Sequence, residues 1–489
     1  MDLNLKIMNI RTNAIIMALL FVSQDIFGFC GFFVAKAPSD LFNQKSEVIL
    51  VRDRDRTTIT MSNDYEGPLD EFAMVIPVPV ILEEEQIRIV DRGVFDRLDA
   101  YSAPRLVEYH DANPCYQPKL TARSEVQNSA PLFDEMIAEE AEDFGVTIEA
   151  SYSIGEYDIL ILSAEESDGL ETWLNRNNYH IPQKARDILQ AYIRTNTKFF
   201  VVKVNLEEQE KSGFDYLRPI QISFESDKFM LPIRLGMANA KGAQDLIVYA
   251  FTRKGRVEAV NYRTAKIPTS KEVPLFVERY FGEFYQDLFE RAYQREGRNA
   301  VFLEYAWNVS PMQGVKCDPC VSPPPVLDDF AKAGVDWVAG MNRESEVFFT
   351  RLHVRYTRDK FPRDLQFQVT PNRENFQARY IIRHPAKGDL SCSQGQTYIE
   401  ELENRRRMEV EELTALTGWT NPNYADYITE FSRATKPGKY APLRNDFGPT
   451  AILPLAEKHG QFGKWLFPLL VFSALIIFKR KRRKLDHTT

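Results

Sequence analysis

The sequence predicts an α+β fold of mixed or mainly antiparallel sheets with interspersed helices, followed by one C-terminal transmembrane helix. Short apolar runs alternate with segments whose apolar residues recur at helical spacing. The strict strand–helix–strand alternation of a doubly wound sheet is absent, which argues against that class. With 489 residues, 44% of them hydrophobic, the chain is long enough for two or three domains with sizeable cores.

The N-terminal half is expected to open with a hairpin, Glu47–Arg52 and Thr57–Met61, around a charged turn. Phe72–Val80 follows as a strand at a sheet edge, because Pro77 and Pro79 lack backbone donors. The other strands expected here are apolar runs: Val146–Ile154, Tyr157–Ala164 and Lys198–Leu206. The helices expected here have apolar residues at helical spacing: Asp91–Tyr101, Leu170–Asn177 and Pro182–Thr195.

The C-terminal half is predicted to be rich in strands up to Tyr262 and mixed after it. Its expected strands are Ile220–Phe224, Met230–Leu235, Asp245–Thr252, Asn299–Trp307, Val347–Tyr356 and Phe376–Arg383. Val273–Arg298 is predicted to be a helix, because its aromatic residues recur on one side. Gln396–Leu416 is predicted to be a charged helix with a narrow apolar stripe. Residues 420–463 are rich in Pro, Gly, Asn and Asp, which is typical of a linker.

Both ends of the chain carry targeting patterns. The apolar stretch Ala14–Val22 follows two cations and is too short to span a bilayer, which predicts a signal peptide. An uncleaved anchor or a buried N-terminal helix is the alternative. Near the other end, the uncharged run Trp465–Phe478 stops at six cations, Lys479–Lys484, as a transmembrane helix with a cytoplasmic tail does. A processed sorting tail is the alternative there.

These patterns predict a single-pass protein of the cell membrane with an extracytoplasmic ectodomain. The expected parts are a signal peptide (1–28), an ectodomain (29–420) with room for two subdomains divided near 210–300, a linker (421–463), a transmembrane helix (464–478) and a basic cytoplasmic tail (479–489). Without the charged residues of the leader and the tail, eight basic and three acidic, 53 basic and 66 acidic residues remain, about −13 in net charge. Nucleic acid needs a basic surface, so the expected partners are the membrane and an unknown protein or envelope ligand.

Five cysteines follow the leader: Cys30, Cys115, Cys317, Cys320 and Cys392. Outside the cytoplasm their default role is structural disulfide bonding, and an odd number leaves one thiol free or paired between chains. Cys317-Asp318-Pro319-Cys320 is the motif most typical of redox chemistry. The Val-Ser-Pro-Pro-Pro segment that follows does not begin a helix, so no helix N-terminus stabilises a thiolate here. A structural disulfide is therefore favoured over a redox site.

No other motif defines a catalytic site, and no metal or cofactor is predicted. The histidines show no metal-ligand spacing, and no GxSxG elbow or phosphate-binding glycine loop is present. Arg351, His353 and Arg355 alternate along one strand, which is compatible with an anion site or with a solvated sheet face. His110 and Asp111 are neighbours in the sequence. An aspartate can orient a histidine that acts as a general base, but residues adjacent in sequence rarely have the geometry for this.

Many segments resemble one bacterial family, the domain of unknown function 2330. The resemblance rests on residues spread over about 28–420: Cys30–Ala37, Val48–Tyr65, Phe72–Pro79, Leu98–Tyr101, Pro104–Tyr109, Tyr157–Trp173, Tyr216–Pro232, Phe302–Trp307, Cys317–Cys320 and Arg351–Tyr356. It implies exported or membrane-attached bacterial proteins and supplies no catalytic residues. The favoured function is a non-enzymatic, membrane-anchored binding or structural ectodomain. The alternatives are an envelope thiol–disulfide protein using Cys317 and Cys320, or a hydrolase with residues from distant segments.

The membrane topology can be tested through the six terminal cations. Replacing Lys479–Lys484 with neutral residues removes the charge asymmetry that orients the helix, so retention in the membrane fraction should fall. Fractionation of spheroplasts, with external protease added to intact ones, measures this directly. Unchanged fractionation would show that these cations are dispensable.

Overall fold

The computed structural model describes residues 32–34, 42–66, 73–115, 146–164, 167–176, 183–214, 216–238, 242–339, 345–434, 448–449 and 451–452. The predicted signal peptide, Cys30, the predicted span 464–478 and the basic tail lie outside these ranges. Within them, no helix is both long enough and apolar enough to cross a membrane.

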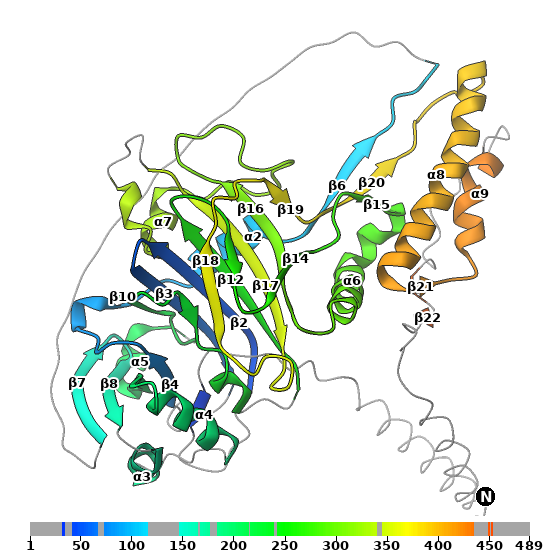
Figure 1. Cartoon of the computed structure of the whole chain (residues 1–489). Helices are drawn as coiled ribbons and strands as arrows, with labels where there is room; N and C mark the ends of the chain where they lie inside the picture. Colours follow the sequence, from blue (N-terminus) through cyan, green and yellow to red (C-terminus); the bar gives the residue numbers. More distant parts are fainter. Residues whose placement is uncertain are drawn as a thin grey trace, which may run out of the picture.

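The fold is a mixed α+β architecture, as predicted, built around a large sheet (Figure 1). Its strands, in spatial order, are β14 (Arg263–Lys266), β16 (Ala300–Asn308), β17 (Phe348–Tyr356), β12 (Gln244–Thr252), β2 (Phe42–Asp53), β3 (Arg56–Glu66), β10 (Ile220–Glu225) and β5 (Ile87–Ile89), with β19 (Phe376–Gln377) beside β16. The pairs β12–β2 and β14–β16 are parallel, and the other neighbours are antiparallel. The predicted hairpin is β2–β3, with Arg54 at positive φ in its turn.

A second sheet of five antiparallel strands packs against one face of the large sheet. Its order is β1 (Phe32–Val34), β4 (Ala73–Val78), β9 (Lys198–Val204), β8 (Tyr157–Ala164) and β7 (Val146–Ile154). The prediction that β4 lies at the edge of a sheet is wrong, because β4 is the second strand, between β1 and β9. β1 pairs only with Ala73–Val75, so the missing backbone donor of Pro77 falls beyond the end of β1.

Alternating side chains of the strands divide the core into layers. In β2, Val48 and Leu50 face the second sheet, whereas Ile49 and Val51 face α2 (Gly93–Ser102) and α7 (Leu327–Ala333). In β9, Phe200 and Val202 face the large sheet. The opposite face of β9 is covered by α3 (Ser167–Arg176) and α4 (Gln183–Ile193). The body is therefore a helix–sheet–sheet–helix sandwich, and period-two alternation places apolar residues on both faces of each sheet.

Short elements complete the body. They are the strands β11 (Met230–Leu231), β13 (Val257–Ala259) and β18 (Leu365–Val369), which form a small sheet, the helix α5 (Leu206–Ser212), and the 3-10 turns η2 (Glu84–Gln86), η3 (Leu235–Ala238) and η5 (Asp336–Val338). The strand expected over Met230–Leu235 is thus limited to β11, and η3 begins at Leu235, the last residue of the expected strand.

A separate arm projects from the body (Figure 1). Its elements are the parallel strands β6 (Arg105–His110), β20 (Arg379–His384) and β15 (Lys271–Glu272), η4 (Leu275–Tyr280), the helices α6 (Phe281–Arg295), α8 (Ser393–Thr417) and α9 (Tyr424–Ala434), and the pair β21 (Trp419–Thr420) and β22 (Ala451–Ile452). The predicted helix 273–298 is divided into η4 and α6.

The linker expected over 421–463 begins with α9, which packs on α8. Tyr427 is 1% exposed, donates its hydroxyl to Glu409 at 2.8 Å, and accepts from Arg406 at 2.6 Å through its carbonyl. Composition does not reveal this, because the aromatic residues that bury α9 are few and lie among polar ones.

The packing of α8 can be tested with two residues of the same helix. Leu413 is 0% exposed and Met408 is 61% exposed. Leu413→Ala should lower the free energy of unfolding by about 2–5 kcal/mol through the cavity it leaves. Met408→Ala should change it by less than about 0.5 kcal/mol. Chemical denaturation of the full chain in detergent measures both, and equal effects would contradict the packing described.

Candidate functional site

The Cys317–Cys320 loop lies between β16 and α7, and its two cysteines are disulfide-bonded with Cα atoms 5.1 Å apart. Cys317 is 3% exposed, while Cys320 is classed as exposed. No helix begins at either cysteine, so the expectation of an extended loop after the motif is confirmed. The bond therefore has one buried and one accessible sulfur.

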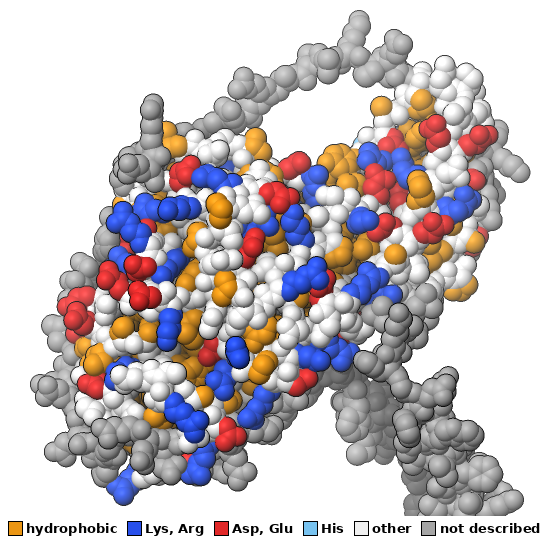
Figure 2. Space-filling model, viewed as in Figure 1, with side chains coloured by type: hydrophobic (Ala, Val, Ile, Leu, Met, Phe, Trp, Pro, Cys, Tyr) orange, Lys and Arg blue, Asp and Glu red, His pale blue; other side chains and the backbone are white. Residues whose placement is uncertain are grey.

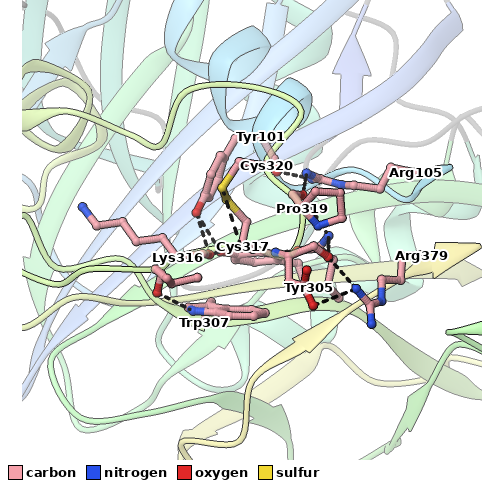
Figure 3. The surroundings of a disulfide bond; sticks show 12 residues. Tyr101, Arg105, Tyr305, Trp307, Lys316, Cys317, Pro319, Cys320 and Arg379 are labelled. Atoms are coloured by element: carbon pink, nitrogen blue, oxygen red, sulfur yellow. Dashed lines mark hydrogen bonds and ion pairs between the residues drawn. A yellow bond between two sulfur atoms is a disulfide. The ribbon is translucent and has the colours of Figure 1, made fainter. Parts of the chain in front are cut away.

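Side chains from five elements, α2, β6, β16, β19 and β20, hold the backbone of this loop (Figure 3). The hydroxyls of Tyr101 and Tyr305 both donate to the carbonyl of Lys316, at 2.8 and 2.7 Å. Burial raises the pKa of Tyr101 to about 12, so this hydroxyl keeps its proton and remains a donor at neutral pH. The loop is thus fixed to α2 and β16 immediately before the first cysteine.

The residues between the cysteines are fixed from the other side. Gln377 accepts from the backbone amide of Asp318 and donates to its carbonyl. Arg379 donates to both the carbonyl and the carboxylate of Asp318 at 2.8 Å. Arg105, 5% exposed, donates to the carbonyl of Pro319 at 3.5 Å and to that of Tyr101.

The second disulfide, Cys115–Cys392, joins residues 277 positions apart, with Cα atoms 6.0 Å apart. Cys392 is also the N-cap of α8, and Cys115 follows β6, so the bond ties the outer end of the arm. The four cysteines in the described part of the chain therefore form two intrachain pairs.

Two of the six histidines meet in the arm. The rings of His110 and His384 stack with centroids 4.3 Å apart, and His384 bonds Glu108 at 2.9 Å. Asp111, which the sequence places beside His110, instead accepts from Tyr398 and Arg405 at 2.6 and 2.7 Å. The adjacent pair His110-Asp111 therefore does not bond as a catalytic dyad.

The row Arg351, His353 and Arg355 lies in β17 on the face covered by α2 and α6, not on a solvated surface. Arg351 is 5% exposed and bonds Glu304 at 2.6 Å and Asp99 at 2.7 Å. Anion binding by this row stays a prediction. In this structure carboxylates of the chain itself already accept from all three residues.

These pairs belong to one continuous ion network across the sheet. Its members are Glu47, Asp99, Asp245, Tyr249, Tyr285, Glu290, Glu304, Arg351, His353 and Arg355. His353 bonds Glu304 through Nδ1 and Asp245 through Nε2, each at 2.9 Å. Its ring also stacks on Phe289 of α6, with centroids 3.8 Å apart.

Opposite charges decide the protonation states at the centre of the network. Burial raises the pKa of Glu304, but the positive charges of His353 and Arg351 outweigh it and lower that pKa to about 2. Burial likewise lowers the pKa of His353, but Glu304 and Asp245 outweigh it, and the net shift is upward. The centre is thus an ionised Glu304 beside the guanidinium of Arg351, and its charge favours the protonated form of His353.

A cleft of about 460 Å³ opens at the β3–β10 end of the large sheet. Its lining residues are Arg56, Thr58, Val80, Ile81, Glu83, Glu85, Gln86, Arg88, Gln221, Ser223, Phe224, Glu225, Gly334 and Asp336. The side chain of Arg56 crosses it, donating to Ser223 at 2.9 Å and pairing with Asp336 at 3.1 Å. Acidic side chains predominate around it.

Several of these residues were missed from the sequence. Glu304 had a usable signal, because a single acid in the apolar strand Asn299–Trp307 requires a buried partner. The cleft residues had no such signal, since they come from four separated segments without a motif. Among the described residues, no group of three or more His, Cys, Asp or Glu side chains is arranged to hold a metal ion.

Comparison with known proteins places the chain in a bacterial family. Residues 25–368 match the family described as an uncharacterized protein conserved in bacteria (DUF2330), so the chain belongs to it. The resemblance inferred from the sequence is confirmed. No curated protein and no solved structure matches the chain.

The raised pKa of His353 predicts a pH-dependent contribution to stability. Protonated His353 stabilises the fold fully below its unfolded pKa of about 6.5, and this contribution is lost as the pH rises through the higher folded pKa. His353→Gln should cost about 3 kcal/mol near pH 6 and less as the pH rises. Denaturation of the full chain at several pH values measures this. A difference that is constant from pH 5 to 9 would contradict it, and His110→Gln, at an exposed position, is the control.

Proposed function

We propose that the chain is an exported binding protein, held at the cell membrane by residues 464–478, and that the cleft between β3, β10 and η2 is its ligand site. The acidic lining of this cleft carries the proposal. Export and membrane attachment rest on the terminal sequence patterns and are supported by the two disulfides, which persist in oxidising compartments.

The cleft has the size of a small-ligand site, and its lining is mostly polar. About 460 Å³ lies within the usual range for ligand pockets. The hydroxyls of Thr58 and Ser223, 2.9 Å apart, supply polar groups in its lining. A ligand that enters can form hydrogen bonds as well as ion pairs.

The charges around the cleft define the class of ligand. Four carboxylates line it, those of Glu83, Glu85, Glu225 and Asp336, against the two guanidinium groups of Arg56 and Arg88. Asp336 pairs with Arg56, so three carboxylates remain against Arg88. A net negative cleft concentrates cations, so the ligand proposed is a polar molecule with at least one positive charge, such as a basic peptide segment.

Over the face seen in Figure 2, acidic and basic side chains are interspersed. A cationic ligand therefore gains more from a local cluster of carboxylates than from the general surface. The net charge of −8 adds a weak, non-specific attraction, which any test has to separate from the cleft.

Binding of a fluorescent tetralysine peptide to the full chain in neutral detergent tests the proposal. Glu83→Gln with Glu85→Gln removes two cleft carboxylates and should weaken binding about tenfold, which corresponds to about 1.4 kcal/mol. Glu207→Gln with Glu208→Gln removes the same charge from α5, outside the cleft, and should weaken binding less than about twofold. Equal losses in both variants would assign the binding to the general surface and contradict the proposal.

A further inference from the structure

The chain segment that contains Cys320 is rich in exposed apolar side chains. Ten large hydrophobic side chains are classed as exposed in the described part of the chain, and half of them lie within residues 312–327: Met312, Val315, Val321, Val326 and Leu327. Met312 and Val315 are 76% and 75% exposed, and Val321, next to Cys320, is 58% exposed. Apolar residues gathered on a surface mark sites of interaction with another molecule.

The two sulfurs of the motif differ in access. Cys317 belongs to the core cluster beneath α2 and α7, whereas Cys320 is exposed. An incoming thiolate can therefore reach only the sulfur of Cys320, and Cys317 is placed as the leaving group. A disulfide that only braces a loop does not require this difference.

A positive charge lies beside the accessible cysteine. The guanidinium of Arg105 donates to the carbonyl of Pro319, the residue before Cys320. Cations near a cysteine favour its thiolate form. The contacts of Tyr101, Tyr305, Gln377 and Arg379 fix the backbone around it, so the pair stays in place when the bond opens (Figure 3).

We propose that Cys317 and Cys320 form a thiol–disulfide exchange site whose substrate is an extended segment of exported polypeptide with apolar residues beside its cysteines. The apolar residues on both sides of Cys320 along the chain contact the substrate, and Cys320 reacts with it. This site uses neither the cleft nor its carboxylates, so it stands or fails independently of the binding proposed above.

The reaction balances as a two-electron exchange. A substrate thiolate attacks Sγ of Cys320, the Cys317–Cys320 bond breaks, and the electron pair and then a proton are taken up by Sγ of Cys317. The second thiolate of the substrate then attacks the substrate sulfur that is bonded to Sγ of Cys320. The substrate disulfide forms, and Cys320 leaves as a thiolate. A small disulfide such as oxidised glutathione accepts the same two electrons and two protons to restore the bond.

The test uses the full chain in detergent and two synthetic dithiol peptides. One carries Leu, Val and Phe beside its cysteines, and the other carries Ser at those positions. The wild-type chain should oxidise the apolar peptide at least tenfold faster than the polar one. Mass spectrometry after alkylation should show that Cys317–Cys320 is reduced while Cys115–Cys392 stays intact.

Variants identify the reacting residues. Cys317→Ser, incubated with the apolar peptide in its disulfide form, should trap a mixed disulfide: the thiolate of Cys320 attacks the peptide disulfide, one peptide thiolate leaves, and no Cys317 is present to resolve the bond. Cys317→Ser with Cys320→Ser should abolish oxidation of the dithiol peptide. Met312→Ser with Val321→Ser should remove the preference for the apolar peptide. Met408→Ser, which changes an equally exposed residue of α8, should leave both rates unchanged.

Two results would overturn the proposal. One is oxidation by the wild-type chain no faster than by the double cysteine variant. The other is a Cys317–Cys320 bond that stays intact in the wild-type chain under excess dithiol peptide, a measurement that requires no variant to fold. An equal rate with both peptides would refute the apolar substrate class.

Discussion

Glu304 is the residue on which the packing of this protein depends most. It is 1% exposed at an irregularity in the register of β16 and β17, where its carboxylate meets Arg351, His353 and Tyr285. A carboxylate without partners at this depth would cost several kcal/mol, so its three partners must all be in position when the sheet is covered. Those partners come from β17 and α6, and Arg351 extends the contact to Asp99 of α2. One side chain thus determines how two strands and two helices fit together.

The same network links the body to the arm. Arg355 bonds Asp245 in the large sheet at 2.7 Å and Glu290 in α6 at 2.9 Å. α6 also contacts α8, and α9 packs on α8. The arm is therefore attached through a half-exposed ion pair as well as apolar packing, and hydrogen-bonded charges accept few alternative arrangements.

The sequence predicted the local elements better than their assembly. β2, β3, β12 and β17 were predicted because alternation and apolar runs are local signals. The stacking of two sheets between helices was not predicted. The inner strands of the large sheet pair with partners far away in the sequence, and a local pattern does not show which strands are neighbours. The pairing of the cysteines could not be predicted either. Cys115 meets Cys392 only because β6 lies beside β20, which the sequence does not show. The cleft joins residues of four separated segments, and nothing in a linear pattern brings Arg56, Glu85 and Asp336 together.

The bond between Cys115 and Cys392 has a consequence for the order of assembly. Its two sulfurs are separated by 277 positions, so neither can meet the other until more than three quarters of the polypeptide has been synthesised. The body has all of its strands by then, whereas the arm is sealed only at the end. Cross-linking a loop of that length raises the free energy of the unfolded chain by about 6 kcal/mol in the chain-entropy description. This disulfide therefore closes the arm after all strands of the body are available, and it restricts the arm of the completed chain.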